Sequence, residues 1–175
     1  MMSRVDSIQY GEGEGYKTVK LPYGEDEEIS MYLILPDESV SINEFIKTMD
    51  STKWKSIKES IVKEDDLKLQ IPKFKLEYGV KELNQSLSNL GMGDAFSKGA
   101  DFSNIGKDIY LSSVFHKAVI EVNEEGSEAA AVTGMEMKAE SFVEPKSFIA
   151  DRPFMFLIVD EEMESILFMG KVLSL

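Results

Sequence analysis

The sequence predicts an α+β fold in which mixed or antiparallel sheets outweigh a few short helices. Strand-like stretches lie near both ends of the chain, and two segments with a helical apolar face follow the first strands. In residues 114–122, the more apolar side chains recur at every second position, as in a strand with one buried face. No internal repeat or low-complexity linker interrupts the 175 residues. We therefore expect a single domain spanning residues 1–175.

Residues 4–36 are predicted to form strands joined by tight turns. The glycine-rich stretch from Gly11 to Gly15 favours a hairpin turn over a phosphate-binding loop, because no helical pattern follows it and its two glutamates would repel phosphate. The apolar run from Ser30 to Leu35, closed by Pro36, is typical of a buried strand.

Two short helices are predicted next. Ser41 and Glu44 have the spacing of a capping box, in which each side chain satisfies a backbone donor. Apolar residues then share one helical face, first Ile42, Phe45, Ile46 and Met49, and in the second helix Trp54, Ile57 and Ile61. The surrounding lysines, at positions 53, 55, 58, 63, 68, 73 and 75, are interpreted as a solvated face; a heparin-like anion site is the alternative.

The rest of the chain is predicted to be mostly strand. Residues 67–78 alternate between apolar and polar side chains on both sides of Pro72, which indicates strand. The spacing of Leu83, Leu87 and Leu90 indicates a helix that ends at Gly91. The alternation over residues 114–122 predicts a strand with one fully buried face. Residues 154–159 and 166–169 are two apolar strands, and the acidic turn between them lacks the ligand spacing of a calcium loop.

Composition excludes several classes of protein. With 19 Lys and Arg against 32 Asp and Glu, the net charge is −13, which argues against nucleic acid or an anionic membrane as the main partner. The chain has no Cys and one His, so thiolate zinc sites, disulfides and multi-His metal sites are excluded, and no metal or cofactor is expected. No apolar run approaches the roughly 20 residues of a membrane span, and no signal peptide opens the sequence.

The most informative segment runs from Glu124 to Ser141. From Ser127 onward, every second residue is uncharged. These residues are Ser127, Ala129, Ala131, Thr133, Met135, Met137 and Ala139. The charged residues Glu128, Glu136, Lys138 and Glu140 all lie at the positions between them. It contains no Pro to block a hydrogen-bond ladder, and Gly126 supplies a pivot at its start. Such a segment can be exposed in one state and become a half-buried strand in another.

This segment resembles the hinge of the reactive loop of serpins, the serine protease inhibitors. The hinge would comprise Glu124, Glu125, Gly126, Ser127, Glu128, Ala129, Ala130, Ala131, Val132 and Thr133. Residues 148–158 resemble the serpin signature that follows the loop, and weaker matches occur in family order at residues 21–23, 30–31, 71–74, 90–96 and 166–170. The chain is thus similar to the C-terminal part of a serpin, an incomplete serpin fold with a reactive loop at about residues 124–145.

The resemblance implies a suicide-substrate mechanism. A serine protease cleaves the loop, forms an acyl-enzyme and is trapped when the loop inserts as a strand into the main sheet. In the family, the hinge glutamate that aligns with Glu124 is usually the first of 17 residues that end at the cleaved bond, which places that bond at Glu140–Ser141. This predicts a Glu-preferring protease; a trypsin-like enzyme cleaving at Lys138–Ala139 is the alternative.

His116 is interpreted as a structural residue rather than a catalytic one. It lies on the apolar face of the 114–122 strand, so we expect a buried, hydrogen-bonded imidazole. In serpins this His sits where the sheet opens, and it bonds a polar residue of the neighbouring strand.

The length departs from the family, because serpins are considerably longer than 175 residues. We expect the N-terminal half of the fold to be missing, which would leave the strand at residues 114–122 with an open apolar edge and His116 without its partner. A non-inhibitory serpin-fold carrier or chaperone and an inactive fragment are the alternative functions. The family resemblance favours an extracellular location, although the sequence leaves this unknown.

Overall fold

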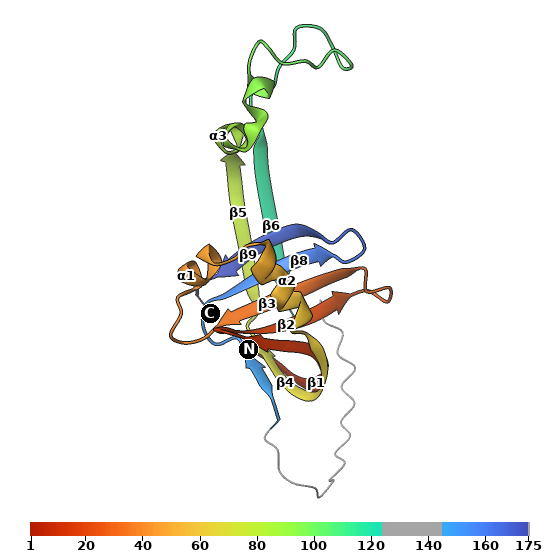
Figure 1. Cartoon of the computed structure of the whole chain (residues 1–175), viewed down its shortest axis with the longest axis vertical. Coiled ribbons are helices and arrows are strands. Elements are labelled where there is room, and N and C mark those ends of the chain that lie inside the picture. Colours follow the sequence, from red (N-terminus) through yellow and green to blue (C-terminus); the bar gives the residue numbers. More distant parts are fainter. Residues whose placement is uncertain (124–144, 175) are drawn as a thin grey trace, which may run out of the picture. The chain divides into compact units, whose positions relative to one another are not determined.

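The computed structural model describes residues 1–123 and 145–174, which fall into two compact units (Figure 1). One unit contains residues 1–74 and the chain from residue 123 onward, and the other contains residues 75–122. None of the described helices is long and apolar enough to cross a membrane.

The first unit is built on a seven-stranded sheet with the strand order β7-β4-β1-β2-β3-β8-β9. Neighbouring strands are antiparallel except for the parallel pair β4–β7, so the sheet is mixed, as the sequence predicted. Its strands are β1 (Met2–Gly13), β2 (Tyr16–Tyr23), β3 (Ile29–Pro36), β4 (Val62–Ile71), β7 (Ser147–Ile149), β8 (Phe154–Asp160) and β9 (Ser165–Val172).

The glycine-rich stretch forms the β1–β2 hairpin, which confirms the turn prediction. Gly15 has a φ of 80°, a left-handed conformation that glycine adopts without strain. A side chain at Gly13 would collide with the ring of Tyr16, so the close approach of the two strands also requires glycine there.

Helices α1 (Ile42–Lys47) and α2 (Ser51–Glu59) pack their apolar side chains against the sheet. The predicted capping box is present, with the Ser41 Oγ accepting a hydrogen bond from the Glu44 backbone N–H at 3.2 Å. Ile61 lies just beyond α2 and still packs against the core. The core that the helices and strands enclose consists of Tyr16, Tyr32, Ile34, Ile42, Phe45, Ile57, Met155, Leu157 and Val159.

The second unit contains the two-stranded sheet of β5 (Phe74–Glu82) and β6 (Phe115–Val122). Lys75 pairs with Glu121 and the Leu83 N–H bonds the Val114 carbonyl, so the two strands are antiparallel. The predicted helix is a short one, α3 (Asn84–Leu87), continued by a π-helical turn (Ser88–Met92) and a 3₁₀ turn (Gly93–Phe96). Gly91 interrupts it with a φ of 99°, as expected of a residue that ends a helix.

Candidate functional site

The predicted reactive segment lies outside the described residues. This covers the hinge from Glu124 to Thr133 and both candidate bonds, Glu140–Ser141 and Lys138–Ala139. The strands that flank it are described: β6 ends at Val122, and β7 begins at Ser147. The two flanks differ in burial and in bonding: β7 belongs to the first unit and β6 to the second.

The distal flank, β7, is the edge strand of the large sheet and pairs with β4. Three residue pairs join it in parallel to β4, from Lys68 opposite Ser147 to Gln70 opposite Ile149. The Phe148 side chain is fully buried, and the Ala150 N–H donates to the carbonyl of Gln70 at 2.8 Å. The chain is therefore fixed within a few residues of the end of the predicted loop.

Lys146, immediately before β7, forms a charged contact with β4. Its Nζ lies 2.7 Å from the Glu64 Oε2 and 5.7 Å from the centroid of the Tyr10 ring. The hydrogen bond to Glu64 raises the pKa of Lys146, so the ammonium form is favoured. Burial, followed by the hydrogen bond to Glu12, raises the pKa of Tyr10, which keeps its phenol neutral.

The proximal flank, β6, is largely uncovered. The side chains of Val114, Ala118, Ile120 and Val122 are half-buried, whereas Phe115, Val119 and Glu121 on the other face are exposed. The alternation read from the sequence is thus present, but the predicted fully buried face is wrong for this chain. The physical reason is that no described element covers the two-stranded sheet in its own unit, since β6 pairs with β5 alone.

His116 requires the same correction. Its side chain is exposed, not buried, and its ring lies 6.2 Å from the ring of Tyr78 on β5. An exposed imidazole carries no desolvation cost that a partner must offset. The sheet-opening role that the family resemblance implies for His116 stays a prediction.

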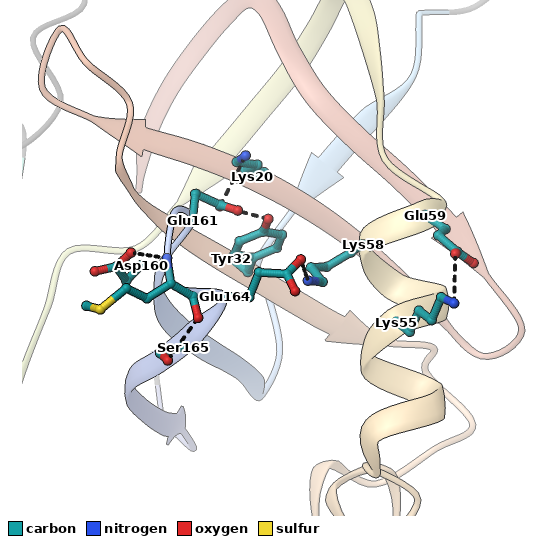
Figure 2. A network of polar contacts seen from close by, with 10 residues as sticks. Lys20, Tyr32, Lys55, Lys58, Glu59, Asp160, Glu161, Glu164 and Ser165 are labelled. Carbon is teal, nitrogen blue, oxygen red and sulfur yellow. Dashed lines mark hydrogen bonds and ion pairs between the residues drawn. The ribbon is translucent and has the colours of Figure 1, made fainter.

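A polar network in the first unit was not predicted from the sequence (Figure 2). Glu161, in the turn between β8 and β9, accepts a hydrogen bond from the Tyr32 hydroxyl at 2.9 Å and lies 3.1 Å from the Lys20 Nζ. Burial and this hydrogen bond raise the pKa of Tyr32. Glu164, in the same turn, pairs with Lys58 of α2 at 3.3 Å, so the turn is held to β2, β3 and α2.

The acidic turn is nonetheless a turn, as predicted, with the Met163 N–H bonded to Asp160. Within the described residues, no group of three or more His, Asp or Glu side chains could hold a metal ion.

Arg152 is another anchoring residue that was not predicted from the sequence. Its Nε donates to the carbonyl of Pro36 at the end of β3. Sequence spacing gave no signal for contacts between residues more than a hundred positions apart.

Comparison with known proteins places these features in a family. The model of the family described as serpin (serine protease inhibitor) matches residues 1–175. Human plasminogen activator inhibitor 2 is 40% identical over 178 residues, which cover 96% of this chain and 42% of that protein. An uncharacterized serpin-like protein of Methanosarcina acetivorans is 41% identical over 177 residues, covering 98% of this chain and 41% of that protein.

Solved structures of serpins have a similar fold. The crystal structure of a thermophilic serpin, tengpin, in the native state matches with a TM-score of 0.76 and 37% identity, over 99% of this chain and 46% of that one. The chain thus spans less than half the length of the proteins it matches.

Proposed function

The chain belongs to the serpin family, the serine protease inhibitors, and from this membership we propose that it supplies the bait and trapping segment of a suicide-substrate inhibitor. A serine protease would attack one bond of residues 124–144 and form an acyl-enzyme. The cleaved segment would then insert into a sheet and distort the protease. The proposed role is therefore inhibition, not catalysis by this chain.

The observation that carries the proposal is the residue pattern at the hinge. Ser127, Ala129, Ala131 and Thr133 are small and uncharged, and they alternate with residues that include Glu128. A strand that enters a packed sheet must present such a set inward, because a bulky or charged side chain there would stall insertion. A carrier or chaperone needs no such pattern, so the inhibitory alternative is favoured.

The physical basis of trapping is the geometry that ester hydrolysis needs. Deacylation depends on an oxyanion hole whose donors lie within hydrogen-bond distance of the developing charge. Catalytic groups lose their effect when they are displaced by more than about half an ångström. Pulling the protease out of shape would therefore preserve the acyl intermediate.

The uncovered sheet of the second unit is consistent with this role. Val80 on β5 and Phe115 and Val119 on β6 are exposed apolar residues. Strands with exposed apolar faces and open edges gain free energy when further strands and layers cover them. We propose that the part of a serpin fold expected to precede the matched region is the partner that supplies them.

We propose Glu140–Ser141 as the bond that the protease attacks. The assignment rests on the count of 17 residues from Glu124 and on the family pattern. The primary pocket of the protease would then offer a cation or polar donors to the Glu140 carboxylate. Lys138–Ala139, attacked by a trypsin-like protease, remains the second candidate.

The test uses this chain completed at its N-terminal side with the corresponding half of the Methanosarcina acetivorans relative. The completed chain is mixed with a Glu-specific and with a trypsin-like serine protease. We expect a complex that survives SDS with the Glu-specific enzyme. Mass spectrometry of the released fragment should give a new N-terminus at Ser141, and a fragment that begins at Ala139 would sink the Glu140 assignment.

Two controls separate inhibition from simple cleavage. Ala131→Arg places a charge in the inward set, so this variant should be cleaved without forming the complex. The 175-residue chain alone should likewise form no complex, because the family resemblance places the strands that receive the segment in the preceding half of the fold. If the completed chain is only cleaved, like the Ala131→Arg variant, the inhibitor proposal is wrong and a binding function is favoured.

A further inference from the structure

Strand β7 is short for an element that anchors a loop. It has three residues, lies at the edge of the seven-stranded sheet and, among the described strands, pairs with β4 alone. Its buried contact is Phe148, in the middle of the strand. Toward the loop, the backbone bonding ends where the Lys68 N–H donates to the carbonyl of Lys146 at 3.0 Å.

The Lys146 side chain extends this attachment beyond the last backbone pair. That pair is Lys68 with Ser147, whereas the Lys146 Nζ reaches Glu64, four residues earlier on β4. The Glu64 side chain is 26% exposed and that of Lys146 is 49% exposed, so the pair is only partly open to solvent. The aliphatic stem of a lysine can cover apolar surface while its head stays charged, and here the head lies over the Tyr10 ring.

The electrostatic surroundings favour this placement. Glu64 accepts the hydrogen bond of the ammonium, and Glu12 adds a second negative charge nearby. Both carboxylates act to keep Lys146 protonated, as the raised pKa of Lys146 reflects. A neutral side chain of similar length would lose the ion pair and retain the apolar contact.

We infer that Lys146 is a positioning residue, which through its ion pair with Glu64 holds the beginning of β7 on β4 and thereby fixes the distal end of the reactive segment. This inference rests on the proposed function for its consequence in inhibition. A bait segment with one loosened end populates the geometry that the protease recognises less often. The rate of complex formation then falls in proportion to the population of that recognised geometry.

The first measurement is hydrogen exchange at single amides, which needs no protease. In Lys146→Met, the Lys68 amide should exchange about two- to fivefold faster, the range expected for loss of one surface ion pair. The Ala150 amide, bonded beyond the buried Phe148, should not change. Lys146→Arg should preserve the protection, and in a Glu64→Gln background Lys146→Met should cause no further acceleration, because the ion pair is already lost.

The second measurement is the second-order rate at which the completed chain forms the SDS-stable complex. It should fall by a similar two- to fivefold in Lys146→Met and keep its wild-type value in Lys146→Arg, with no change in melting temperature. The matched control is Lys55→Met, which removes another Lys–Glu surface pair, to Glu59 on α2, and should change neither rate nor exchange.

The outcomes distinguish this inference from the proposed function. Unchanged Lys68 exchange in Lys146→Met, or an equally large acceleration by Lys146→Met in the Glu64→Gln background, overturns the ion pair as the attachment. Faster exchange with an unchanged rate of complex formation overturns its positioning role. If the completed wild-type chain forms no complex, the proposed function fails, and the exchange data alone decide whether Lys146 holds β7.

Discussion

At the scale of single residues, the hydrogen bond between Tyr32 and Glu161 carries the clearest prediction. The Tyr32 side chain is buried, and its hydroxyl donates to a carboxylate that is itself only 25% exposed (Figure 2). Tyr32→Phe should lower the free energy of unfolding by about 1–2 kcal/mol, as measured by chemical denaturation. Tyr23→Phe is the matched control, because the Tyr23 hydroxyl donates to the Met31 sulfur, a weak acceptor, at 3.7 Å, and the loss of that bond should cost little.

The same hydroxyl predicts a dependence of stability on alkaline pH. Burial and Glu161 raise the pKa of Tyr32 above its ordinary value, so the folded chain favours the neutral phenol more than the unfolded chain does. The stabilisation is therefore complete below about pH 10, where an unfolded tyrosine ionises, and is lost as the pH rises above that value. Thermal melts at pH 9 and pH 11 should show a smaller loss for Tyr32→Phe than for the wild type; an equal loss would contradict the assignment.

At the scale of elements, the start of α1 tests how local sequence determines structure. Ser41→Ala removes the side chain that accepts the Glu44 N–H and should cost about 1 kcal/mol of unfolding free energy. Ser51→Ala is the control, because Ser51 is the first residue of α2 and Asp50 caps that helix by accepting the Lys53 N–H. Equal destabilisation by the two substitutions would show that the capping box has no special effect.

The elements also show what the sequence could and could not predict. The capping box, the β1–β2 hairpin and the apolar strands were readable because each depends on residues within a few positions of one another. The ion pair of Lys146 with Glu64 joins residues 82 positions apart, and no spacing indicates it. The pattern of β6 showed which face is the more apolar, yet the layer that would cover that face is not encoded in the strand itself.

At the scale of the whole molecule, exposed apolar residues cluster on the final edge strand. Strand β9 ends the large sheet, and Ile166, Leu167, Phe168 and Met169 are all exposed on it. A long apolar edge strand with free backbone groups is a template for pairing with another chain. Since the chain spans 41–46% of the length of its relatives, this edge is where we expect further parts of a serpin fold to pack.

The 175-residue chain alone should therefore self-associate through β9. We expect size-exclusion chromatography with light scattering to show oligomers that increase with concentration, and Phe168→Lys to shift the population toward the monomer, because a lysine on an edge strand opposes pairing. Leu90→Lys is the control: Leu90 is 80% exposed but belongs to the π-helical turn and not to a strand, so this variant should associate like the wild type. A chain that stays monomeric at high concentration would contradict the expectation. It would mean that β9 can remain exposed to solvent without driving association.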